Sequence, residues 1–174
     1  MSKLINTSLK TGSLLLLIAV LFTIGCQQPK PDPSVELKPI VDKLIEVWNN
    51  GNLDELDVII DPNFVRSVNQ IPDVEGVDGL IKVVTAFRTA YPDVKLTWDN
   101  GIFSENRVAG RWTFKGTNTG PSEMPPTGRS VNIWGESIFY IENGKITREI
   151  VAYDNLAFME QLGYTMMPLS DAKQ

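Results

Sequence analysis

Few residue types in this chain could perform chemistry. The 174-residue sequence contains no histidine and a single cysteine, Cys26. A Ser-His-Asp or Cys-His arrangement is therefore impossible, and the usual zinc ligand and the usual general base near neutral pH are both missing. Any acid–base chemistry must use carboxylates, tyrosine or lysine. The candidate catalytic residues are Glu149 and Asp154, which lie near the C-terminus.

Glu149 lies in segment 145–153, which reads as a strand, so that side chains two positions apart share a face. The same alternation applies to the predicted strands 107–115 and 129–141. Together the three strands place eight residues on one face, which we expect to line a cavity: Trp112, Phe114, Ile133, Ser137, Phe139, Glu149, Val151 and Tyr153. Glu149 would act there as a base; the alternative is a structural or exposed role. Tyr153 would orient a polar ligand or simply pack as an aromatic.

Asp154 has a competing structural interpretation. It directly precedes segment 155–162, which we expect to be a short helix. An aspartate at that position accepts hydrogen bonds from the free N–H groups of the helix and acts as its N-cap. Catalysis and capping are therefore both open for this residue.

The elements that position these residues fall into two groups. Apolar spacing of three and four predicts helices over 37–50 (closed by Asn50-Gly51, with Pro39 in the first turn), 53–60 and 77–91. Asn63-Phe64-Val65 is expected to be extended. From Val94 the period is two, which predicts strands at 94–100, 107–115, 129–141 and 145–153 and a hairpin turn at Asn143-Gly144. Helices before a four-stranded antiparallel meander indicate an α+β fold, a curved sheet wrapped round the first helix as a cone.

Aromatic residues from several elements are candidates for the wall of the cone, the alternative being an ordinary core. The candidate ligand-binding residues are Trp48, Phe64, Phe87, Trp112, Asn118, Ser137, Phe139, Val151 and Tyr153. The loop from Gly116 to Ser130 is long and rich in glycine and proline, so it would be either a rim that gates access or an ordered hairpin end.

The opposite face of the sheet combines charged and apolar side chains. Arg111, Glu136 and Arg148 would form a cross-strand charge ladder. The face also carries more apolar residues than solvent contact needs, namely Trp134, Ile138, Tyr140 and Ile150. We therefore expect a homodimer that packs through this face.

The N-terminal segment predicts a bacterial lipoprotein. Residues 1–25 combine two lysines with a short apolar run and end in Thr23-Ile24-Gly25 before Cys26. We expect cleavage before Cys26 and lipid on that cysteine, with 26–36 as a Pro-rich tether, 37–165 as the domain and 166–174 as a loose tail. An ordinary secretory signal or an uncleaved anchor is the alternative. The predicted location is the cell envelope, facing the periplasm or at the outer membrane.

Charge and length restrict the partners. Loss of residues 1–25 would leave 149 residues and, because two lysines go with them, change the net charge from −5 to −7. This length suits one domain with a real core. A negative charge argues against nucleic acid and against electrostatic binding to anionic lipid.

Short motifs in a fixed order run through residues 40–163. They are Trp48-Asn49-Asn50-Gly51, Pro62-Asn63-Phe64-Val65, Tyr91-Pro92-Asp93, Gly116-Thr117-Asn118-Thr119-Gly120, Pro125-Pro126-Thr127-Gly128, Gly144-Lys145-Ile146 and Gln161-Leu162-Gly163. In this order they resemble the SnoaL-like polyketide cyclase (ester cyclase) family, which has the NTF2-like cone fold. The resemblance implies chemistry without cofactors: an aspartate in an apolar pocket, with a raised pKa, removes a C–H proton, and an aldol reaction closes a ring.

The positions that would carry this chemistry differ in this chain. By spacing, Val151 stands where the family has its aspartate, and Ser137 and Phe139 stand where it has a glutamine and a histidine. Asn118 replaces a further histidine. A relocated carboxylate, Glu149 or Asp154, would have to act instead.

Three functions remain open at this point. The chain would bind a small apolar or carbonyl-containing molecule without a cofactor, it would be a cyclase, isomerase or hydrolase with a relocated carboxylate, or it would be a non-catalytic interaction module tethered to the membrane. A cavity with a buried carboxylate favours the first two functions. A cavity filled by its own aromatic side chains favours the third.

Overall fold

The computed structural model describes residues 30–69, 71–165 and 167. The chain divides into two units, Met1–Pro31 and Asp32–Gln174, and the fold below is that of the second. The predicted signal peptide, Cys26, the start of the predicted tether and, apart from Met167, the tail lie outside the described residues. Within the described part of the chain, no helix has both the length and the apolar character needed to cross a membrane.

Helix α2 (Pro33–Asn50) begins earlier than the sequence predicted. Asp32 is its N-cap and accepts a hydrogen bond from the backbone N–H of Ser34 at 2.9 Å. Residues 33–36 therefore belong to the helix and not to a tether, and Pro39 lies in the helix interior and not in its first turn. The predicted end is confirmed, because Gly51 adopts φ 74°, the left-handed conformation that closes a helix.

The middle of the chain contains a strand that the sequence analysis underestimated. The second predicted helix is the 3₁₀ turn η1 (Leu53–Glu55) followed by α3 (Leu56–Ile59). After it comes the nine-residue strand β1 (Ile60–Val68), where only a short extended piece was expected. β1 pairs with the two-residue strand β2 (Val74–Glu75), and helix α4 (Gly76–Ala90) corresponds to the third predicted helix.

The four predicted C-terminal strands are confirmed, and together with β1 and β2 they form one sheet. They are β3 (Lys95–Ser104), β4 (Arg107–Thr117), β5 (Ser130–Glu142) and β6 (Lys145–Tyr153), and the short helix α5 (Asn155–Gln161) follows. The strand order is β2-β1-β6-β5-β4-β3. The sheet therefore has six strands and not four, and β1 lies parallel to β6 while the other pairs are antiparallel.

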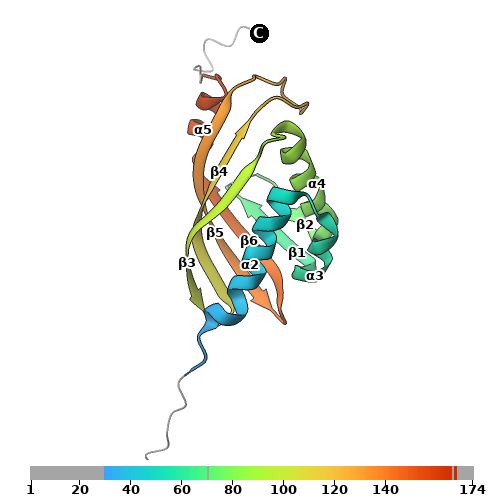
Figure 1. Ribbon diagram of the computed structural model, residues 1–174, viewed down its shortest axis with the longest axis vertical. Helices are drawn as coiled ribbons and strands as arrows, with labels where there is room; N and C mark the ends of the chain where they lie inside the picture. The colour runs from blue at the N-terminus through green and yellow to red at the C-terminus, as the bar shows by residue number, and fades with distance from the viewer. Residues whose placement is uncertain (1–29, 70, 166, 168–174) are drawn as a thin grey trace, which may run out of the picture. The chain divides into compact units, whose positions relative to one another are not determined.

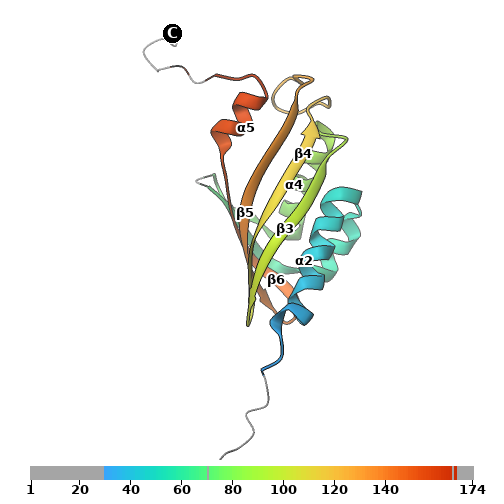
Figure 2. The ribbon, with the colours of Figure 1, turned by 60° about the vertical axis from the view of Figure 1, so that its left-hand side comes forward.

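The sheet is strongly twisted, and α2, α3 and α4 pack on one side of it (Figures 1 and 2). Between the helices and the sheet lies a core of fully buried aliphatic side chains, such as Leu44, Leu80, Val84, Val108 and Ile146. Two polar ties hold the first helix to its neighbours. The amide of Asn49 hydrogen-bonds both backbone groups of Leu96 on the edge strand β3, and Arg88 donates to the carbonyl of Trp48 near the end of α2.

The outer face of the sheet differs from the predicted charge ladder. Arg111 stands directly opposite Glu136, but its guanidinium pairs with Asp99 at 3.4 Å and lies over the ring of Trp134 at 4.7 Å. Arg148 stands opposite Tyr140 and is out of register with Glu136. The predicted ladder was wrong because Asp99 on β3 pairs with Arg111, and because alternation along a strand does not give the register of Arg148 against Glu136. Trp134 remains 55% exposed on this face.

Candidate functional site

A pocket opens between the helices and the concave face of the sheet. The centre of a water-sized sphere can occupy about 60 Å³ of it. All eight residues that strand parity assigned to the cavity face line it. The remaining lining residues come from α2, α4, α5 and the strands β1 and β3, and are Leu44, Ile45, Trp48, Arg66, Phe87, Leu96, Trp98 and Phe158.

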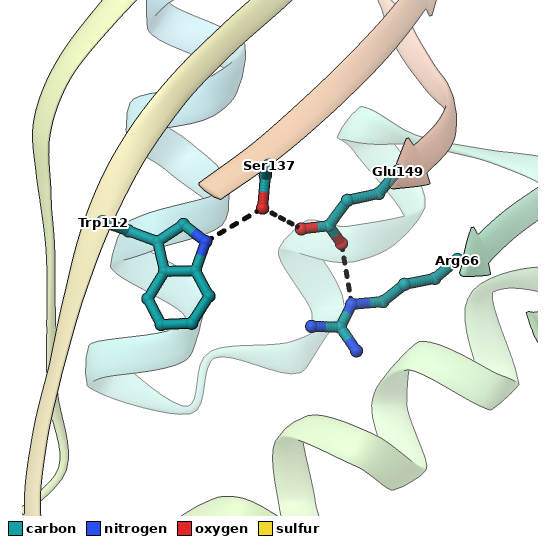
Figure 3. Close-up of polar contacts among 4 residues, drawn as sticks. All are labelled: Arg66, Trp112, Ser137 and Glu149. Carbon is teal, nitrogen blue, oxygen red and sulfur yellow. Dashed lines mark hydrogen bonds and ion pairs between the residues drawn. The ribbon is translucent and has the colours of Figure 1, made fainter. Parts of the chain in front are cut away.

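One polar cluster interrupts the apolar wall (Figure 3). The indole N–H of Trp112 donates to the hydroxyl of Ser137 at 3.0 Å, and this hydroxyl donates to Oε1 of Glu149 at 2.9 Å. The other carboxylate oxygen, Oε2, accepts from Nε of Arg66 at 2.8 Å. The side chains of Arg66 and Glu149 are only 12% and 8% exposed. The cluster is thus a buried ion pair, with each carboxylate oxygen already accepting a hydrogen bond.

Arg66 is the charged site residue that sequence reasoning missed, and Leu44, Ile45, Leu96, Trp98 and Phe158 are the other lining residues that it did not name. Arg66 lies on β1, directly beside Glu149 in the parallel register of β1 and β6. The only available signal was alternation: Phe64 and Arg66 share one face of a strand, so a buried Phe64 implies an inward-pointing arginine. Pro62 concealed that signal, since proline within such a run argues against a strand.

The apolar wall is built mainly from aromatic rings in edge-to-face or tilted contact. Phe87 meets Trp48 and Phe114 with centroid distances of 5.7 and 5.8 Å. On the other side of the pocket, Trp98 meets Phe139 at 5.7 Å. Trp98 fits against the sheet because Gly110 has no side chain: a Cβ there would lie 2.2 Å from the indole ring. Glycine is required at that position by this close approach.

Tyr153 lies at the edge of this wall, 6.2 Å from the ring centroids of both Trp112 and Phe158. Burial raises the pKa of its hydroxyl, and the nearby positive charge of Arg66 opposes that shift. The hydroxyl is thus kept neutral near pH 7, as a hydrogen-bonding group and not as a charge.

Three predicted site residues do not line the pocket. Phe64 is 1% exposed and belongs to the hydrophobic core beneath it. Asp154 is the N-cap of α5, where its Oδ1 accepts from the backbone N–H of Ala157 at 2.9 Å. Its carboxylate is occupied by the helix terminus, which the sequence analysis left open as the alternative to catalysis.

The third, Asn118, holds the loop between β4 and β5. Its backbone N–H and C=O bond to Arg129 and Gly128, and its side-chain oxygen accepts from the backbone N–H of Thr127 at 2.8 Å. The next turn of the loop is tied to α4 through a backbone bond from Gly120 to Ala90. No described residue from 118 to 130 lines the pocket. The loop is therefore an ordered hairpin end, and Asn118 has a structural position.

The arrangement limits the chemistry that the pocket can support. Among the described residues, no group of three or more Asp, Glu, His or Cys could hold a metal ion. Glu149 is the carboxylate that lines the pocket, and Val151, 2% exposed, lies beside it. What the site presents is a neutral ion pair, one tyrosine hydroxyl and a large aromatic surface. Such a surface suits the binding of a mostly apolar molecule that carries one polar group.

Comparisons with known proteins agree with the fold. No curated protein matches the chain. A solved structure from Jannaschia sp. CCS1, assigned to the SnoaL-like polyketide cyclases, superposes with a TM-score of 0.70 at 19% identity, covering 80% of this chain and 99% of that one. TsrD from Streptomyces laurentii gives 0.68 at 22% identity, with 78% and 98% covered.

A third structure shows a ligand in a protein of this shape. It is a hypothetical protein with a ketosteroid isomerase-like fold from Catenulispora acidiphila in complex with trimethylamine, with a TM-score of 0.62, 14% identity and coverage of 74% and 97%. The family model of the SnoaL-like polyketide cyclases matches residues 38–162. The chain therefore belongs to the SnoaL-like polyketide cyclase family.

Proposed function

We propose that this protein is an envelope lipoprotein that binds a small, mostly apolar molecule in its cone-shaped pocket without a cofactor. The observation that carries the proposal is the pocket itself. Its walls are aromatic and aliphatic around a single polar cluster, which is the kind of lining that small-molecule sites commonly have. An apolar molecule gains roughly 25 cal/mol for each Å² that it buries there.

Binding is favoured over ring closure by the state of the carboxylate. Val151 occupies the position where the family resemblance places the catalytic aspartate, and a valine cannot accept a proton. Glu149 is in the pocket, but Arg66 and Ser137 already donate to its two oxygens. A substrate C–H group would have to approach a carboxylate that two donors already hold.

Proton transfer by Glu149 is the second candidate function, because this carboxylate faces the pocket. It can be tested with 2-acetylnaphthalene, an enolisable ketone, in D₂O. If Glu149 acts as a base, the protein will accelerate deuterium incorporation into the methyl group, as observed by NMR, and Glu149→Gln will abolish the acceleration. No acceleration over buffer would eliminate this function for such ketones.

The binding proposal is tested by filling the pocket from one side of a strand. Val151→Phe places a ring in the pocket, whereas Ile150→Phe, the adjacent residue, adds the same ring to the opposite face of β6. We expect 2-isopropenylnaphthalene to change the fluorescence of the pocket tryptophans in the wild type and in Ile150→Phe, and at least tenfold weaker binding in Val151→Phe. Equal binding by both variants, with both folded by circular dichroism, would place the ligand elsewhere.

The lipid anchor is a separate part of the proposal. It rests on the lysines, the apolar run and the Thr23-Ile24-Gly25-Cys26 sequence of the N-terminal segment. Acyl chains on Cys26 would supply about 0.8 kcal/mol for each buried CH₂, so two or more chains hold a protein stably at a membrane. Cys26→Ser should accumulate an uncleaved precursor without incorporated palmitate. Normal processing of that variant would refute the anchor and leave the pocket proposal intact.

A further inference from the structure

The two Nη groups of Arg66 have no hydrogen-bond partner among the residues that the structure describes. Its Nε is bonded to Glu149, and Figure 3 shows the two Nη atoms pointing away from the carboxylate. Among residues 30–69, 71–165 and 167, no oxygen accepts a hydrogen bond from either Nη atom. The guanidinium nevertheless lines the pocket, and its Cζ lies 5.9 Å from the ring centroid of Trp48. A planar group with four N–H donors thus faces the ligand space.

The pocket has a surplus of hydrogen-bond donors. The two Nη groups of Arg66 line it without an acceptor among the described residues. Each carboxylate oxygen of Glu149, in contrast, already accepts one hydrogen bond, from Arg66 or from Ser137. Buried donors without acceptors are costly, so a ligand that brings oxygen acceptors complements this pocket better than one that brings donors.

The charge balance of the pocket restricts those acceptors further. Arg66 and Glu149 are the only charged residues in the described lining, and they neutralise each other. A carboxylate ligand would add a net negative charge to a poorly solvated site, close to Glu149, at a large desolvation cost. A cationic ligand would lie close to Arg66. An uncharged oxygen acceptor accepts charge-assisted hydrogen bonds from the guanidinium and adds no net charge.

We propose that Arg66 is the specificity-determining residue of the pocket and binds the uncharged oxygen acceptor of the ligand, such as the carbonyl of a ketone, ester or amide. Glu149 has two roles in this recognition: it orients the guanidinium through Nε, and its charge excludes carboxylates. The inference rests on the proposed binding function, because it names the class of molecule which that pocket selects.

The test compares three molecules with one scaffold and different head groups, using the purified protein and isothermal titration calorimetry. They are 2-acetylnaphthalene, the carboxylate 2-naphthoate and the hydrocarbon 2-isopropenylnaphthalene, which has the shape of the ketone. We expect the ketone to bind about tenfold more tightly than the hydrocarbon, as one net hydrogen bond to a charged group allows. The carboxylate should bind most weakly of the three.

Two variants separate the roles of the pair. Arg66→Met should remove the advantage of the ketone over the hydrocarbon. Glu149→Gln, which keeps the shape of the side chain, leaves Arg66 without a counter-charge, so the carboxylate should bind at least tenfold more tightly than it binds the wild type. Arg111→Met, an arginine on the outer face, is the matched control and should change none of the affinities.

The outcomes are distinct. Equal binding of the ketone and the hydrocarbon by the wild type, or unchanged carboxylate binding by Glu149→Gln, would overturn the role of Arg66 and leave the pocket proposal standing. If none of the three molecules binds, the proposed function fails and the inference fails with it. If Arg66→Met does not fold, the reversal in Glu149→Gln decides the question alone, since that variant retains the Ser137 hydrogen bond.

Discussion

The buried ion pair makes a sharp prediction about stability. With Arg66 12% exposed and Glu149 8% exposed, removing one partner leaves a charge in a poorly solvated site, which costs about 3 kcal/mol of unfolding free energy. We take the lower end of the usual range because Ser137 still donates to Glu149 and the pocket mouth gives some access to water. Arg66→Met and Glu149→Leu should therefore each cost about 3 kcal/mol.

The double variant should cost no more than either single one. Arg66→Met with Glu149→Leu removes both charges and leaves an apolar pair, with a Ser137 hydroxyl that has lost its acceptor. We expect about 3 kcal/mol where additivity would give about 6, a coupling of about 3 kcal/mol. In urea, with an m-value of about 2 kcal/mol/M for a domain of this size, each variant should lower the unfolding midpoint by about 1.5 M.

An exposed ion pair of the same chain supplies the control. Lys38 and Asp42 lie one turn apart on α2 and are 56% and 45% exposed, so the same cycle with Lys38→Met and Asp42→Leu should give a coupling of at most about 0.5 kcal/mol. Far-UV circular dichroism would follow both cycles. If the double variant of Arg66 and Glu149 lost the additive 6 kcal/mol, or if each single variant lost less than about 1 kcal/mol, the ion pair would not be buried and coupled.

Three further predictions concern the supports of the site. Gly135→Ala would place a Cβ 2.3 Å from the ring of Trp112; we expect a loss of about 2–3 kcal/mol and altered tryptophan fluorescence, and unchanged melting would contradict the packing. Asp154→Ala should cost about 1 kcal/mol through the lost N-cap without changing ligand affinity, and an affinity loss would show that Asp154 reaches the ligand. Hydrogen bonds from the backbone and hydroxyl of Thr117 hold the pKa of Asp93 below its ordinary 3.8. Its stabilising effect is therefore present above pH 3.8 and lost as pH falls through the lower pKa of the folded state, so Asp93→Asn should be less stable than the wild type at pH 7, and a melting deficit that did not shrink toward pH 2 would refute this.

The strands of the C-terminal half could be predicted from the sequence because the patterns that indicate them lie within short segments of the chain. Strands of a hairpin can be predicted from alternating apolar and polar residues and from turns such as Asn143-Gly144. The strand β6 begins and ends at the predicted residues. Side-chain direction then follows from counting, since each step along a strand reverses the face. Counting alone placed Ser137, Glu149 and Tyr153 on the wall that lines the pocket.

Arg66 was not accessible in that way because its position depends on a long-range pairing. β1 joins the sheet by lying parallel to β6, which follows it by about eighty residues, and the register is irregular between Ile60 and Val65. No local pattern encodes such a pairing. The assignment of Asn118 to the ligand-binding site was wrong for another reason. The resemblance placed Asn118 at the position of a site histidine, but a short amide side chain can also hold a loop by accepting hydrogen bonds from backbone N–H groups. In this chain that local bond, to Thr127, is the one formed.

We propose that a carboxylate at position 149, in place of one at position 151, adapts the pocket to recognition and not to catalysis. Val151 stands opposite Ser137, and Glu149 stands opposite Phe139, one inward-facing step away along β6. That step is about 6.6 Å, yet the Glu149 carboxylate reaches the Ser137 hydroxyl at 2.9 Å, because glutamate is one methylene longer than aspartate and leans along the strand. The negative charge therefore lies beside Ser137, although Glu149 itself stands one inward-facing position away along β6, next to Arg66. A carboxylate held by two donors serves better to orient a guanidinium than to remove a proton, which is why we favour selective binding over ring closure.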